Sequence, residues 1–131
     1  MSGPVRIDPP GLPKPPPRTY SHIARAGNLL FIAGQVGMGA DGKLVGPGMK
    51  EQLEQVYLNL ETALKSQGAT FAHVTKLTTY VMDVPEYRSP EMAAVRARFV
   101  GEIPPPNTLL QITQLADPAY KVEVEAIAVL P

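Results

Sequence analysis

The 131-residue sequence contains no cysteine. The chain therefore forms no disulfide, and it has neither a thiolate nucleophile nor a thiolate ligand for a metal. Long apolar runs are also missing, because none approaches the roughly 20 residues that a membrane-spanning helix needs. The N-terminus lacks the basic and then apolar pattern of a secretory signal peptide. We therefore expect a cytoplasmic protein with no membrane partner.

Charge of one sign does not accumulate along the chain. The 12 Lys and Arg residues balance the 12 Asp and Glu residues, and no block of like charge appears. Proteins that bind nucleic acids or anionic membranes need clustered Lys and Arg. The sequence therefore predicts no nucleic-acid partner, although a local pocket for a small anion is compatible with it.

The length and composition fit one compact domain with a real core. Hydrophobic residues make up 44% of the chain and charged residues 18%, which is typical of a globular protein. Residues 1–18 hold seven of the 15 prolines. Because proline lacks an amide donor and fixes φ, we expect a proline-rich arm at 1–18, extended or draped on a single domain at 19–131.

From residue 19 the sequence alternates between strand and helix patterns. The β-type runs 19–27 and 29–36 flank Gly27-Asn28, which predicts a hairpin. Apolar residues at helical spacing predict a helix over 49–64, and Gly68 marks its end. We further predict a strand at 74–84, a helix at 86–100, and strands at 108–115 and 121–130.

This β-β-α-β-α-β-β order predicts an α+β fold, with two helices on one face of a mixed sheet. So few helices leave the opposite face of the sheet uncovered. A second subunit is the simplest cover for it.

The last strand carries two acids on one face. Alternation places Glu123 and Glu125 together, about 7 Å apart, with Val122 and Val124 on the other face. One interpretation is a solvated strand start near Lys121. The other is a carboxylate facing a cleft, where partial burial raises its pKa and allows general acid or base chemistry.

The helix at 86–100 carries an arginine among its apolar residues. Arg96 follows Met92 by four residues and so shares its stripe. Such a guanidinium either extends past the edge of the stripe to a carbonyl or carboxylate, or lines a pocket and clamps a substrate carboxylate. The sequence leaves both open.

Polar residues also gather around the first hairpin, including Tyr20, His22 and Gln35. His22 and His73 are the only histidines and have no metal-ligand spacing, so we expect structural or solvated roles and no metal. Neither a G-x-S-x-G motif nor a phosphate loop is present. Residue chemistry alone indicates an oligomeric α+β domain with a carboxylate-bearing cleft.

Three segments together resemble one known family. They are "GNLLFIAGQVG" with the following "DGKLV", the run "EQLEQVYLNLETALKSQGATFAHVTKLTTYVMD", and the close "KVEVEAIAVLP". Over about residues 19–131 the chain is similar to the Rid (reactive intermediate deaminase, YjgF) family. The resemblance implies a chorismate-mutase-like fold and a homotrimer with a barrel-like core and clefts between subunits. It also implies hydrolysis of reactive enamines and imines, such as 2-aminoacrylate, without a cofactor.

The resemblance also exposes a departure from the family pattern. In the family's deaminases an arginine in a P-x-R-[ST] context holds the substrate carboxylate. Here the matching residues are Pro105, Pro106, Asn107 and Thr108, so Asn107 takes the place of the arginine. An amide donor without charge forms a weaker bond to a carboxylate. We therefore expect little of the ordinary 2-imino-acid deaminase activity.

Other positions are mixed. Tyr20 matches the family's pocket tyrosine, and Glu123 matches its water-orienting glutamate. Ala33 replaces a hydroxyl residue before Gly34 and Gln35, which with Asn107 and Thr108 are the expected ligand-binding residues. A position often occupied by asparagine in the family's cleft aligns with Arg96. This match favours the interpretation in which Arg96 lines a pocket.

Two functions remain open at this point. The first is a deaminase-like hydrolase of altered substrate choice, with Glu123 and Tyr20 as catalytic residues and Asn107 with Arg96 at the polar end of the ligand. The second is a non-catalytic trimer that binds a small molecule in the same clefts. A messenger-RNA nuclease is disfavoured by the balanced charge.

Overall fold

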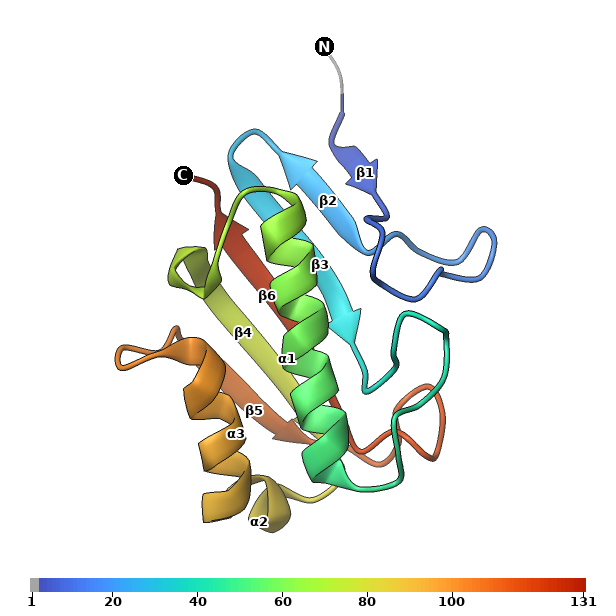
Figure 1. Cartoon of the computed structure of the whole chain (residues 1–131), viewed down its shortest axis with the longest axis vertical. Helices are drawn as coiled ribbons and strands as arrows, with labels where there is room; N and C mark the ends of the chain where they lie inside the picture. Colours follow the sequence, from blue (N-terminus) through green and yellow to red (C-terminus); the bar gives the residue numbers. More distant parts are fainter. Residues whose placement is uncertain (1–2) are drawn as a thin grey trace.

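The computed structural model describes residues 3–131, which form one mixed sheet with helices on one face (Figure 1). The sheet has six strands in the order β1-β2-β3-β6-β4-β5. Only the β4–β5 pair is parallel. The strands are β1 (Val5–Ile7), β2 (Ile23–Ala26), β3 (Leu29–Gln35), β4 (Val74–Val81), β5 (Asn107–Gln111) and β6 (Val122–Val129).

The helices form a single layer over β3, β6, β4 and β5 (Figure 1). They are α1 (Met49–Ser66), the short α2 (Val84–Tyr87) and α3 (Pro90–Val100), with a 3₁₀ turn η1 (Phe71–His73) before β4. The predicted α+β fold, with helices on one face of a mixed sheet, is confirmed.

The core lies between α1 and the sheet. The predicted stripe of α1 is buried, and Leu53, Val56 and Leu60 have no exposed surface. Alternate residues of β6 meet it, because Val122, Val124, Ala126 and Ala128 are all buried. Gly68, with φ of 75°, follows the helix in the left-handed region that favours glycine.

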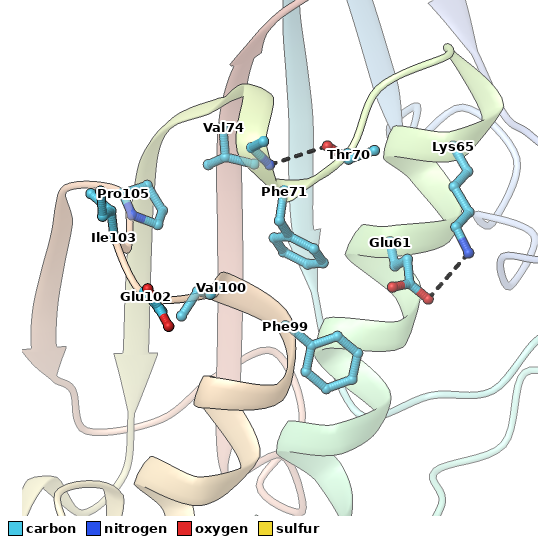
Figure 2. A pocket seen from close by; sticks show the side chains of 12 residues that line it. Glu61, Lys65, Thr70, Phe71, Val74, Phe99, Val100, Glu102, Ile103 and Pro105 are labelled. Carbon is cyan, nitrogen blue, oxygen red and sulfur yellow. Dashed lines mark hydrogen bonds and ion pairs between the residues drawn. The ribbon is translucent and has the colours of Figure 1, made fainter.

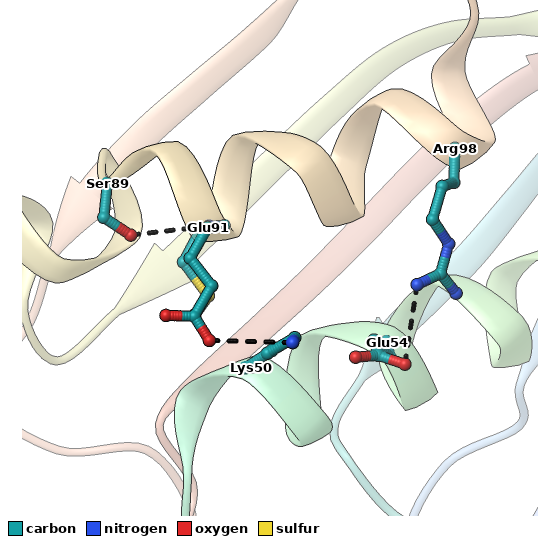
Figure 3. A network of polar contacts seen from close by, with 6 residues as sticks. Lys50, Glu54, Ser89, Glu91 and Arg98 are labelled. Carbon is teal, nitrogen blue, oxygen red and sulfur yellow. Dashed lines mark hydrogen bonds and ion pairs between the residues drawn. The ribbon is translucent and has the colours of Figure 1, made fainter.

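Two ion pairs join α1 to α3 on the solvent side of the helix layer (Figure 3). Lys50 pairs with Glu91 at 3.7 Å, and Arg98 pairs with Glu54 at 3.6 Å. All four side chains are substantially exposed, so each pair contributes at most about 1 kcal/mol. The apolar stripe, rather than these pairs, holds the helices on the sheet.

Part of the proline-rich arm is more ordered than the sequence suggests. Residues 5–7 pair with β2 as an added edge strand, in the register Val5 with Arg25 and Ile7 with Ile23. The predicted helix over 86–100 is interrupted as well. Ser89 caps α3 by accepting a hydrogen bond from Met92, and Pro90 occupies the first turn, where a missing amide donor costs nothing.

The outer face of the sheet, opposite the helices, carries no helix among residues 3–131. Leu29 is 38% exposed and Phe31 42%, and both lie on this face beside Val129 and Ile127 of β6. No described helix is both long and apolar enough to cross a membrane.

Candidate functional site

The outer face becomes polar toward the start of β6, and this polar end holds the candidate site. Glu123 and Glu125 are half-buried here, on the face opposite Val122 and Val124, as alternation predicts. In the β4–β6 register Glu123 lies opposite Tyr80, and Glu125 lies opposite Thr78. Two strands therefore bring two carboxylates, a phenol and a hydroxyl together.

Glu123 rests on the backbone of β3. A Cβ atom at Gly34 would lie 2.0 Å from the Glu123 Oε2 atom, so only glycine leaves room for this carboxylate. Burial, and then the charge of Glu125, raise the pKa of Glu123 above its ordinary value. The expected pairing of Gly34 with Glu123 therefore has a steric basis.

Tyrosines surround the two acids. The Tyr80 hydroxyl donates to Glu125 Oε1 at 2.5 Å, and this bond is the main cause of the raised pKa of Tyr80. Partial burial is the first cause of the raised pKa of Tyr20 and Tyr120, and the charge of Glu123 adds to both. The predicted Tyr20 thus lies within electrostatic range of Glu123, together with two phenols that the sequence did not single out.

A buried amide holds the segment that leads into β6. Gln52, fully buried at the start of α1, donates to Gly46 O at 2.9 Å and to Ala119 O at 3.0 Å. It also accepts from the amide of Lys121 at 2.8 Å. Because these bonds fix both sides of Tyr120, Gln52 determines where β6 begins and hence where Glu123 lies.

Asn107 begins β5 at the edge of the sheet and is exposed. Its Oδ1 atom accepts a hydrogen bond from the buried Thr79 hydroxyl at 2.9 Å. Thr79 lies on the helix-facing side of the sheet, as does Leu77, the register partner of Asn107. This bond engages the amide oxygen, and the amide N–H groups make no hydrogen bond among residues 3–131.

The neighbouring Thr108 points to the outer face. Its hydroxyl accepts a hydrogen bond from Lys76 Nζ, and it lies beside Thr78 in the parallel β4–β5 register. The ligand-binding residues expected at 107 and 108 therefore lie on opposite faces of the sheet.

Asn107 and Glu123 do not meet within one chain. They are separated by three residues along the strands and by two strand spacings, since Leu77 pairs with Asn107 and Tyr80 pairs with Glu123. That separation is roughly 14 Å between Cα atoms, and the side chains lie on opposite faces. One small ligand cannot touch both residues of a single copy.

Gln35, which we expect to bind a ligand, is buried on the helix side of the sheet. It is 2% exposed, and its Nε2 atom lies 3.0 Å from Ala33 O and 3.1 Å from His22 Nδ1. The β3–β6 register shifts between Ile32 and Gln35, and this irregularity turns Gln35 toward the helix side. Its observed contacts are structural, as the sequence suggested for His22.

Arg96 also lies away from the acids. Its guanidinium donates to Tyr87 O at 2.8 Å and stacks 4.4 Å from the centre of the Tyr87 ring. Both residues belong to the helix layer, on the opposite side of the sheet from Glu123. Of the two interpretations left open, the geometry favours the arginine that reaches a carbonyl, and it does not bring Arg96 to the site.

A separate cleft of about 450 Å³ opens between η1, the end of α3 and the loop that precedes β5 (Figure 2). Phe71 and Phe99 line it, and Glu61 and Lys65, one turn apart on α1, form an ion pair at its rim at 3.6 Å. Neither Glu123 nor Asn107 lines this cleft. Among residues 3–131 no group of three acidic or imidazole side chains is arranged to hold a metal ion.

Comparison with known proteins gives consistent matches over most of the chain. A family model described as endoribonuclease L-PSP matches residues 13–130. A RutC family protein of Pyrococcus horikoshii is 34% identical over 110 residues, which are 83% of this chain and 85% of that protein. The 2-iminobutanoate/2-iminopropanoate deaminase of Rattus norvegicus is 30% identical over 84% of this chain and 79% of its own length.

A solved structure, that of RidA from an Antarctic Psychrobacter bacterium, superimposes with a TM-score of 0.86 at 25% identity. The match covers 96% of this chain and 99% of that one.

Proposed function

Because the chain belongs to the Rid (YjgF) family, we propose that it hydrolyses a small imine or enamine in clefts between three copies of itself. The observation that carries this proposal is the carboxylate of Glu123. It is half-buried on an otherwise uncovered face, it is held against Gly34, and its pKa is raised. A raised pKa makes the carboxylate a better proton acceptor.

The reaction needs an oriented water and a proton acceptor. The water oxygen bonds to the imine carbon while Glu123 takes one of its protons. Glu123 returns this proton to the nitrogen of the resulting carbinolamine. The C–N bond then breaks as the hydroxyl group loses its proton, which gives ammonia and a carbonyl product. An enamine enters the same route after a proton shift to its imine form. Holding water and substrate together supplies most of the rate enhancement.

Asn107 is proposed to alter the choice of substrate. The Asn107 oxygen already accepts a hydrogen bond from Thr79, so the amide has only its two N–H groups to offer a ligand. Family deaminases have a guanidinium at this position. A neutral donor favours a carbonyl or hydroxyl group on the substrate over a carboxylate. We expect weak turnover of 2-aminoacrylate and faster turnover of an imine without a carboxylate.

A trimer would bring the separated groups together. The apolar part of the outer face, formed by Leu29, Phe31, Ile127 and Val129, offers a surface for other copies. Asn107 lies on the sheet edge, so a neighbouring copy can present its Asn107 near the Glu123 of another chain. This arrangement removes the roughly 14 Å separation found within one chain.

Replacement of Glu123 by glutamine tests the mechanism. Turnover of imines generated in the assay should fall about 10²- to 10⁴-fold, because glutamine has no basic carboxylate. The variant Glu86→Gln, an exposed acid at α2 on the helix side, should match the wild type. Equal turnover by the wild type and Glu123→Gln would exclude this mechanism.

Asn107→Arg tests the substrate choice. Restoring the cation should raise turnover of 2-aminoacrylate well above that of the wild type. Fast turnover of 2-aminoacrylate by the unaltered chain would contradict the role given to Asn107. Binding of imine analogues without any turnover would favour a non-catalytic binder, and a salt-sensitive shift of RNA by the pure protein would favour a nuclease.

A further inference from the structure

The proline-rich arm folds back on the sheet and borders a second, open hollow, of about 660 Å³, distinct from the cleft of Figure 2. Three cations line it: Arg6 from β1, and Lys14 and Arg18 from the loop that follows. Tyr20 forms part of the same wall. The hollow thus gathers a quarter of the chain's 12 basic residues at one place.

The cations in this hollow are poorly neutralised. No ion pair involves Arg6, Lys14 or Arg18 within the part of the chain that the structure describes. The one acid in the wall, Asp8, accepts a hydrogen bond from the His22 amide at 2.8 Å. Three positive charges therefore face one carboxylate that is already engaged, so the hollow attracts anions.

The arm is anchored, so the backbone that carries these charges keeps its place. The His22 ring, 2% exposed, lies with Nε2 at 2.5 Å from Pro13 O, while its Nδ1 is 3.1 Å from the Gln35 amide nitrogen. Since the Pro13 carbonyl only accepts, Nε2 carries the proton. The pairing of β1 with β2 holds the other end of the loop. A site fixed in advance loses less entropy when a ligand binds.

Arg18 has an uncommon backbone conformation. Its φ is 63°, and it is the one residue other than glycine with positive φ among residues 3–131. Glycine or asparagine adopts this conformation with less strain. A strained arginine at the rim of a cationic hollow is a sign that its side chain is used.

We propose that this hollow binds a small organic anion through its carboxylate or phosphate group, with Arg18 as the principal contact and Lys14 and Arg6 beside it. The hollow supplies positive charge beside Tyr20. The neutral Asn107 supplies no such charge. Anion binding here stands by itself, whereas any link to turnover rests on the proposed function.

Titration of the full-length chain with two probes tests the proposal. Inorganic phosphate and pyruvate are added separately at constant ionic strength, and the amide NMR signals of residues 6 and 18–21 are followed. One probe should shift these signals to saturation, and the tighter of the two identifies the preferred anionic group. Arg18→Asn, which tolerates positive φ, should weaken that binding about tenfold or more.

The controls separate this site from general charge effects and from catalysis. Lys43→Gln, at an exposed cation that does not line the hollow, should leave the dissociation constant unchanged. Arg18→Gly should unfold at the same or a higher temperature than the wild type, because it relieves the backbone strain. Glu123→Gln should bind the anion as the wild type does, even where its turnover is lost.

Two results would overturn the proposal. One is the absence of saturable shifts with both phosphate and pyruvate. The other is an unchanged dissociation constant in Arg18→Asn.

Discussion

The two faces of the sheet differ in what covers them. The helix-facing side is complete within one chain, because Leu53, Val56 and Leu60 of α1 meet Val124 and its neighbours on β6 with no exposed surface. The outer side leaves Phe31 42% exposed and sets the half-buried Glu123 only a few residues away in the sheet. One face is covered within the chain, and the other is left uncovered by residues 3–131.

The two faces therefore hold different kinds of residues, those that stabilise the fold and those that are open to a ligand. Residues on the helix side are fixed by contacts within the chain. Their polar members, such as Gln52 and Gln35, form hydrogen bonds with the backbone and, for Gln35, with the buried His22 ring. On the outer side the polar groups bond one another and remain open to a ligand or a second copy. We therefore place the proton transfer by Glu123 on the outer side and the stability on the helix side.

The largest expected effect is the loss of assembly through the outer face. Phe31→Glu puts a charge in the apolar surface that we assign to subunit contacts, and burying it unpaired is costly. The trimer should dissociate into folded monomers, which sedimentation velocity detects. Leu58→Glu, in α1 and also exposed (43%), should leave the assembly unchanged. If the Phe31→Glu variant remained trimeric, Phe31 would lie outside the subunit interface.

A core substitution should act on the helix side alone. Leu53→Ala removes a side chain with no exposed surface, and the cavity should lower the free energy of unfolding by about 2–5 kcal/mol. Chemical denaturation measures this change. Leu58→Ala, in the same helix but exposed, should change it by no more than about 0.5 kcal/mol. Equal losses in the two variants would contradict the assigned core.

Gly34→Ala should lower imine turnover more than it lowers the free energy of unfolding. The added methyl group would lie 2.0 Å from Glu123 Oε2, so the carboxylate must move. A displacement of this size should lower imine turnover about a hundredfold. Gly3→Ala, where no atom lies within 4 Å of the added group, serves as the control. Undiminished turnover in Gly34→Ala would mean that the position of Glu123 is unimportant.

The smallest effect concerns stability and pH. Because burial and Glu125 raise the pKa of Glu123, the folded protein binds that proton more tightly than the unfolded chain. Stability therefore falls as pH rises from the ordinary value of 4.5 through the raised pKa. Glu123→Gln removes this penalty and should raise the thermal midpoint slightly at pH 7, with the advantage vanishing below about pH 4.5. A lower midpoint at pH 7 would contradict the assigned burial.

Features that depend on local pattern were predictable from the sequence. The stripe of α1, the turn at Gly27 and the alternation that sets Glu123 beside Glu125 are all confirmed, because the period of the side chains is visible in the sequence. The uncovered outer face followed from the small number of helices. The family was identified from the same segments and is confirmed.

Features that depend on register or distant pairing were not predictable. Simple alternation puts Gln35 on the face of Phe31, but the irregularity between Ile32 and Gln35 reverses it, since a shift of one residue changes faces. Arg96 follows the apolar stripe as predicted, yet the Tyr87 carbonyl that receives it comes from a separate short helix. Tyr80 joins the acids only through the β4–β6 register.

The strand in the proline-rich arm was also not predictable from the local sequence. Residues 5–7 are short and lie among prolines, and their strand forms only because β2 offers an unpaired edge.

Sedimentation equilibrium of the unaltered chain tests the central claim most directly. The chain has a mass of 14.1 kDa. If other copies complete the outer face, the measured mass should equal that of three chains and should hold at micromolar concentration. The mass of a single chain would mean that Phe31 and Glu123 face solvent, and the site proposed between copies would not exist.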